Sequence, residues 1–123
     1  MPKIVEEPVL IPFSITLTSG QVARSQPVPI EPDSDFLLTG IHGTSTGSYN
    51  INFRLPGGRN FATVPVKNAN LVGTAAQPTA IGPAPLYRRG SNGPVIDSIT
   101  DTSGATNTIE LCFTGVRQTT IGS

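Results

Sequence analysis

Few residues in this chain of 123 could do chemistry. His42 is the only histidine, so any Ser-His-Asp triad would have to use it as the general base. We expect no Gly-x-Ser-x-Gly nucleophile elbow in the chain. The aspartates fall in or near loops, at Asp33, Asp35, Asp97 and Asp101. We interpret His42 as a structural histidine and expect no enzymatic activity.

Metal ligands are also sparse. A zinc site would need His42 and Cys112 together with carboxylates, which falls short of the usual ligand sets. Cys112 has the opposite strand parity from its apolar neighbours, and a small buried hydrophobe is the default reading. The run Glu31-x-Asp33-x-Asp35 alternates like the start of a calcium loop, but it lacks the glycine and glutamate of an EF-hand. We expect an acidic turn, no metal and no cofactor.

Two carboxylate pairs, Asp97 with Asp101 and Asp101 with Glu110, have residue types that a glycosidase uses. The chain has no tryptophan and only two tyrosines, so an aromatic platform for a sugar is missing. Gly57-Gly58-Arg59 lacks the Lys-Ser/Thr and the helix of a phosphate loop. These patterns argue against a glycosidase, a lectin and a nucleotide-binding protein.

The clearest structural signal is Gly47–Val66. Its first half alternates apolar and polar residues, a period of two that predicts a half-buried strand. Pro56–Arg59 supplies a turn, and the alternation of Ala62, Val64 and Val66 then resumes. We predict a β-hairpin, with Arg59 exposed at its tip and able to touch a partner.

Glycine (13 residues) and proline (12) separate further alternating runs. The predicted elements are Phe13–Thr18, a strand at Gln21–Ile30 that is an edge strand or leaves the sheet, a central strand at Phe36–Thr44, a short strand or helical turn at Asn68–Val72, Val95–Thr100 and Asn107–Arg117. Such spacing favours an antiparallel sandwich or barrel. We predict an all-β, single-domain, jelly-roll-like sandwich over residues 13–117, with an extended N-terminal arm at 1–12 and a polar C-terminal tail at 118–123.

Two segments lack a strand pattern. Met1–Ile11, with prolines in and just after it, should be extended. It is either a frayed terminus or an arm that lies along a neighbouring subunit, as an added strand or a docked segment. Gly73–Pro85 carries no charge, which argues against a solvated linker, so we expect it to lie across a surface. Together with the arm, it would bury apolar area across subunit boundaries.

The charge composition also favours a chain whose surface contacts other proteins. Only 13% of residues are charged, the formal net charge is zero, and arginine outnumbers lysine six to two. This balance predicts no nucleic-acid or membrane partner and suits a subunit whose surface other proteins cover. The single cysteine fits a reducing compartment, and no leader or membrane-length apolar run is seen. We expect synthesis in the cytoplasm.

Residues 35–41, 47–53 and 101–117 together resemble small structural proteins of tailed bacteriophages, above all capsid decoration (cement) proteins. The resemblance implies a virion protein that forms a homo-oligomer, a trimer or a dimer, and that bridges neighbouring shell subunits of the major capsid protein. A tail, collar or head–tail connector component is the alternative within this class. A carbohydrate- or receptor-binding module is the alternative of another class, through Tyr87, Arg88 and Arg89. The predicted partner contacts are Ile4, Val5, Val9, Leu10, Arg59, Ile81, Tyr87, Arg88 and Arg89.

Overall fold

The computed structural model describes residues 3–30, 33–74, 76–89 and 93–121. The predictions made for Met1 and Pro2 of the arm, Glu31 of the acidic turn and the last two residues of the tail lie outside these ranges. In chain order the elements are β1 (Lys3–Leu17), β2 (Val22–Pro27), β3 (Asp35–Ser45), β4 (Tyr49–Arg54), β5 (Val66–Lys67), α1 (Asn68–Leu71), β6 (Thr79–Ala80), β7 (Leu86–Tyr87), β8 (Val95–Asp101) and β9 (Asn107–Ile121).

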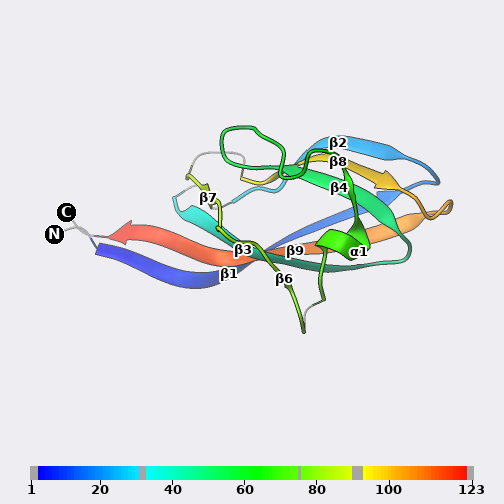
Figure 1. The fold of residues 1–123 in the computed structure, drawn as a ribbon. Coiled ribbons are helices and arrows are strands. Elements are labelled where there is room, and N and C mark those ends of the chain that lie inside the picture. The colour runs from blue at the N-terminus through cyan, green and yellow to red at the C-terminus, as the bar shows by residue number, and fades with distance from the viewer. Residues whose placement is uncertain (1–2, 31–32, 75, 90–92, 122–123) are drawn as a thin grey trace.

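The strands form two antiparallel sheets packed face to face, which confirms the predicted all-β sandwich (Figure 1). The first sheet has the order β1-β9-β3-β6, with β7 also paired to β3. The second sheet has the order β2-β8-β4-β5. As predicted, β3 is central, and the proline-bearing β2 is an edge strand because proline lacks a donor for a second neighbour.

The core lies between the sheets and consists of the apolar residues that alternate along the long strands. From β9, Ile109, Leu111 and Phe113 are all buried, and from β4, Tyr49, Ile51 and Phe53 are buried. The Phe53 and Phe113 rings meet edge to face, 6.1 Å apart at 79°, and so join the two layers. The predicted period-two faces of these strands are confirmed.

The first and last strands, β1 and β9, are longer than the sequence indicated. β1 begins at Lys3 rather than Phe13, and β9 continues to Ile121 rather than ending at Arg117. The two strands pair in unbroken register from Lys3 opposite Ile121 to Leu17 opposite Asn107. The described part of the arm, residues 3–12, therefore pairs with residues 112–121, which include the described part of the tail, and the two form one ribbon. The local sequence pattern does not indicate this pairing, because each half becomes a strand only through a partner about 100 or more residues away.

The predicted hairpin is present only in part. β4 pairs with β5 at Asn50–Ile51, but its long partner is β8, and residues 56–65 form a loop instead of a returning strand. The side chain of Asn52 explains the loop: its Nδ2 donates to the carbonyl of Ala62 at 2.9 Å, and its Oδ1 accepts from the Ala62 N–H at 3.0 Å. These bonds take the place of a strand ladder. Gly57 and Gly58, at φ +92° and +86°, make the predicted turn.

The uncharged segment after α1 lies along the edge of β3. The Gly73 N–H donates to the Ile41 carbonyl at 3.3 Å, and the Ile81 N–H donates to the Thr39 carbonyl at 2.9 Å. β6 and β7 each add two paired residues to β3. The expectation that this segment covers a surface is confirmed, and the surface it covers belongs to its own chain. Residues Asn68–Leu71 form the helical turn that was one of two predicted alternatives.

Candidate functional site

His42 and Cys112 lie directly opposite each other on β3 and β9, on the solvent face of the first sheet. Cys112 is half-buried between the buried Leu111 and Phe113, so its predicted parity is confirmed. No group of three or more His, Cys, Asp and Glu residues able to hold a metal occurs among the residues that the structure describes. The pair therefore falls short of a metal site.

The letters Gly-x-Ser-x-Gly do occur, at Gly43–Gly47. The structure places them at the end of β3 and in the turn into β4, so a strand follows instead of a helix. The Ser45 Oγ donates to the carbonyl of Gly47 at 2.7 Å and is used by the turn itself. The segment lacks the strand-to-helix geometry that exposes a nucleophile.

The carboxylates considered as catalytic pairs have structural partners. Asp97 Oδ1 accepts two hydrogen bonds from Arg54, from Nε at 3.1 Å and from the terminal nitrogen at 2.9 Å. Asp101 is buried and accepts from the Ser103 Oγ at 2.6 Å and from the Gly20 N–H at 2.9 Å. These donors, the Ser103 hydroxyl first, hold the pKa of Asp101 well below its usual range. A carboxyl held ionised in this way makes a poor general acid.

The predicted Tyr87-Arg88-Arg89 cluster does not form on the surface. Tyr87 is 2% exposed, its hydroxyl donates to the Arg54 carbonyl at 2.8 Å, and burial raises its pKa. Arg88 and Arg89 are exposed, and the Arg89 N–H donates to the Asp35 carboxylate at 2.8 Å. Tyr87 is thus a core residue, because it pairs with the buried Phe36 on the inner side of β3.

The prediction that Ile81 contacts a partner is corrected for the same reason, since Ile81 is 8% exposed and belongs to the chain's own core. Burial within the sandwich leaves its side chain unable to contact a partner. Arg59 keeps its predicted exposure at the turn after β4, where its carbonyl accepts from the Leu55 N–H. The contact residues that remain accessible are therefore concentrated on β1.

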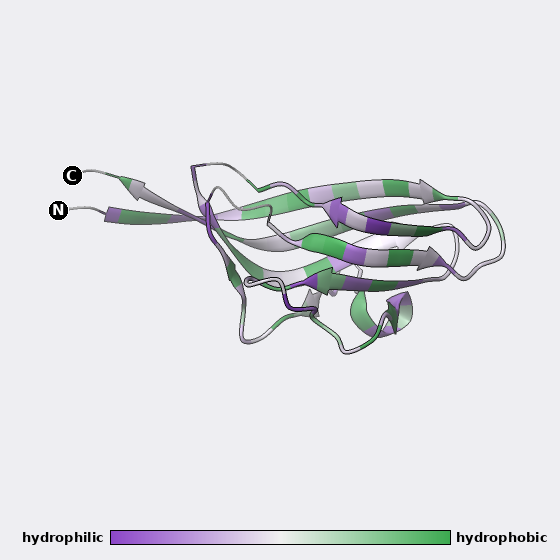
Figure 2. Cartoon of the chain, turned by 90° about the horizontal axis from the view of Figure 1, so that it is seen from above, coloured by the Kyte–Doolittle hydropathy of each residue, from purple (hydrophilic) through white to green (hydrophobic). Residues whose placement is uncertain are grey.

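Figure 2 shows the ends of β1 and β9 extending together beyond the body of the sandwich. Among the described residues of this ribbon, three large apolar side chains are strongly exposed: Ile4 (64%), Leu10 (60%) and Ile121 (54%). Val5 and Val9 are half-buried, and Val9 packs against the core. Sequence reasoning found the β1 residues but missed Ile121. Its only signal was a single apolar residue in a polar tail.

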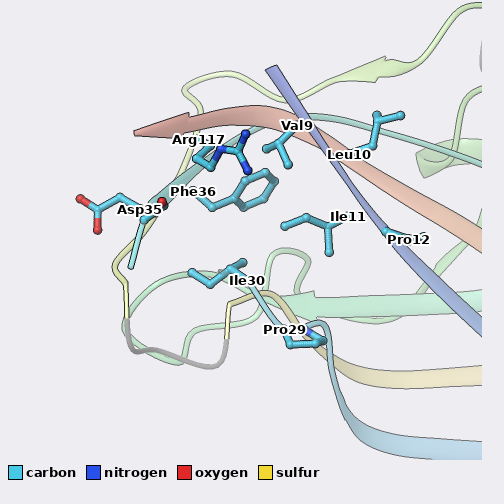
Figure 3. A pocket seen from close by; sticks show the side chains of 10 residues that line it. Val9, Leu10, Ile11, Pro12, Pro29, Ile30, Asp35, Phe36 and Arg117 are labelled. Atoms are coloured by element: carbon cyan, nitrogen blue, oxygen red, sulfur yellow. The ribbon is translucent and has the colours of Figure 1, made fainter. Parts of the chain in front are cut away.

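A pocket lies where the ribbon leaves the sandwich (Figure 3). Val9 and Ile11 point into it, together with Ile30, Phe36 and Arg117, whereas Leu10 leaves β1 on the opposite side. A terminal nitrogen of Arg117 lies 3.5 Å from the carboxylate of Glu7 across the ribbon. Most residues of the pocket wall are apolar, so the site favours contact with an apolar side chain over chemistry on a polar substrate.

The candidate site therefore comprises the exposed apolar side chains of the ribbon and the pocket beside them. Among the described residues no helix is long and apolar enough to cross a membrane. No known protein family, no curated protein and no solved structure matches this chain.

Proposed function

We propose that this chain is a non-enzymatic structural protein of a bacteriophage virion, which decorates and stabilises the capsid by bridging neighbouring shell subunits. It would act as a homo-oligomer on the capsid surface after synthesis in the host cytoplasm. The proposal rests on one observation, the β1–β9 ribbon. Side chains alternate between the two faces of a strand, so Ile4 lies on one face of the ribbon and Ile121, opposite Lys3, lies on the other.

A projecting ribbon with an exposed apolar residue on each face leaves apolar surface in contact with water on both sides, which is unfavourable. Insertion between two neighbouring subunits would cover both faces at once. Each Å² of apolar surface removed from water contributes about 25 cal/mol. Contacts that are weak singly become strong together, because many copies bound to one lattice act through multivalency.

The strand order gives further support. If β6 and β7 count as one interrupted position beside β3, the chain has eight positions, and the first pairs with the last. The remaining positions nest in the same way: β2 with β8, β3 with β6 and β7, and β4 with β5. We infer that this nested order is that of a jelly roll, a fold found in viral capsid and lectin domains. Fold alone does not determine function, so the ribbon carries the argument.

Binding to capsids tests the proposal. Purified chain is mixed with capsids of the encoding phage that lack it, and co-sedimentation is measured. The wild-type chain should bind, and the double variant Ile4→Asp, Ile121→Asp should lose binding. Val64→Asp is the matched control, because Val64 is equally exposed, at 63%, but lies in the loop after β4. Virions that lack the chain in their protein profile, or wild-type chain that stays in the supernatant, would overturn the proposal.

The connector alternative predicts a different stoichiometry. A ring component would be present at a small fixed number of copies, whereas a decoration protein scales with the number of shell subunits. Quantitative densitometry of purified virions distinguishes the two. The carbohydrate-binding alternative loses the side chain on which it depended, since Tyr87 is buried.

A further inference from the structure

The solvent face of the first sheet carries a continuous band without charge. The band consists of three cross-strand rows. Each row runs from β1 through β9 to β3, and two of them continue to β7 or β6. The rows are Pro8, Val116, Leu37 and Leu86; then Leu10, Thr114, Gly40 and Ala80; then Pro12, Cys112 and His42. We call these eleven residues the outer patch.

Charges border the outer patch on both sides along the strands. The row with Glu6, Gln118 and Asp35 flanks it toward the ribbon end. The row with Ser14, Glu110 and Thr44 flanks it on the other side. An uncharged centre with a charged rim is the usual anatomy of a protein–protein interface.

The face has the size that a stable dimer needs. Strands lie about 4.8 Å apart and rise about 3.4 Å per residue, so 11 residues each of β1, β9 and β3, with the two residues each of β6 and β7, span roughly 600 Å². Two copies packed face to face would bury roughly 1,200 Å², at the lower end of the usual range for specific interfaces. The outer patch alone spans roughly 400 Å² of this face.

A twofold contact is compatible with the pattern of the rows. Leu10 is 60% exposed and projects from β1 at one edge of the outer patch. A twofold axis parallel to the strands, between β9 and β3, places each uncharged row of one copy over the same row of the other. Leu10 of one copy then lies over Ala80 of the other, and no charged side chain opposes it.

We propose that the outer patch is the contact between two copies of this chain, packed through their first sheets about a twofold axis. The inference rests on the proposed function, because it specifies the homo-oligomer that the function requires. It can be tested without any capsid. The ribbon ends stay outside the contact and remain available to the shell.

Sedimentation velocity over a concentration series tests the dimer. The wild-type chain should be a dimer, and Leu10→Arg, which places a charge without a partner in the uncharged contact, should raise the dissociation constant about 100-fold. Val64→Arg is the matched control and should leave the dimer intact, since Val64 has nearly the same exposure, at 63%, outside the first sheet. Circular dichroism confirms that each variant is folded.

Cys112 provides a second readout, because it is the only thiol and lies in the outer patch. Maleimide should modify it slowly in the wild-type dimer and faster in folded Leu10→Arg. A monomeric wild-type chain, a trimer, or a dimer that Leu10→Arg leaves unchanged would overturn the inference. Capsid co-sedimentation of the same variants separates the two proposals: capsid binding without a dimer refutes only the twofold contact, and a dimer that never binds capsid refutes only the function.

Discussion

Asn107 donates a hydrogen bond from its Nδ2 to Oδ1 of Asp101 at 3.1 Å, and both side chains are buried where β8 turns into β9. Asn107 also donates to the Ser48 carbonyl at 2.9 Å, and its Oδ1 accepts from the Gly47 N–H at 3.0 Å. Asp101 accepts from the Gly20 N–H in the turn after β1. Three turns at one end of the sandwich are thus joined through two side chains.

Asp101 should make the stability of the chain depend on pH. Its pKa in the folded state is lowered by the Ser103 hydroxyl, the Gly20 N–H and further donors, so its contribution is complete above the ordinary carboxyl pKa of about 4. That contribution is lost as the pH falls toward the folded-state value. The urea concentration at the midpoint of unfolding should therefore decrease as the pH is lowered from about 5 to about 3, a range of roughly two units around the ordinary pKa.

The variants separate this effect from general acid lability. Asp101→Asn should be less stable than wild type at pH 7 and should show a weaker fall in midpoint on acidification. Ser103→Ala removes the hydroxyl that lowers the pKa of Asp101 most. Its stability at pH 7 and its decrease in midpoint on acidification should lie between those of wild type and Asp101→Asn. A wild-type slope retained in Asp101→Asn would show that the turn network is not its source.

Tyr49 should limit stability at the alkaline end. Burial raises its pKa to about 12, above its ordinary value of 10.0. The stabilisation is complete below the ordinary value and is lost as the pH rises through the folded-state value, because only the unfolded chain ionises readily. Tyrosinate absorbance and circular dichroism should therefore change together above pH 10. Tyr49→Phe should shift unfolding to higher pH, and tyrosines that ionise near 10 in a folded chain would contradict this.

Asn52 should hold the loop at residues 56–65 in place. The side chain is 2% exposed and makes two bonds to Ala62, so Asn52→Ala leaves the loop without its anchor. The expected cost is about 1–3 kcal/mol of unfolding free energy, with faster proteolysis confined to this loop. Asn50→Ala, on the same strand and only half-buried, is the control. Equal protease sensitivity of the two variants would show that Phe61, stacked on Phe53 at 4.6 Å, holds the loop instead.

Regular alternation made much of this fold predictable. The core faces of β4 and β9 follow directly from Tyr49, Ile51 and Phe53 and from the run ending at Phe113, because a strand presents every second residue to one face. Strands of two residues show no such period, so the burial of Tyr87 in β7 and of Ile81, which directly follows β6, came only with the structure. The ribbon was half predicted: β1 looked extended, but nothing near Ile121 indicates a partner at Lys3.

Prolines on β1 should protect its free edge. β1 is an edge strand, and its ladder with β9 runs unbroken through Pro8 opposite Val116 and Pro12 opposite Cys112. Both positions have the same parity, so their missing N–H groups fall on the outer edge, where a further strand would otherwise pair. This makes docking through the ribbon faces more favourable than strand addition.

Replacing both prolines tests this. Pro8→Thr, Pro12→Thr restores two donors to the edge, and the variant should form open-ended assemblies that grow with concentration, detected by light scattering and thioflavin binding. Adding Leu10→Arg should leave that growth intact, because edge pairing uses the backbone and not the outer patch. The matched control Ser14→Thr, at the same parity on β1, already has its N–H and should behave as wild type. If the double variant stays as soluble as Ser14→Thr, the free edge is protected by the twist of the ribbon and not by its prolines.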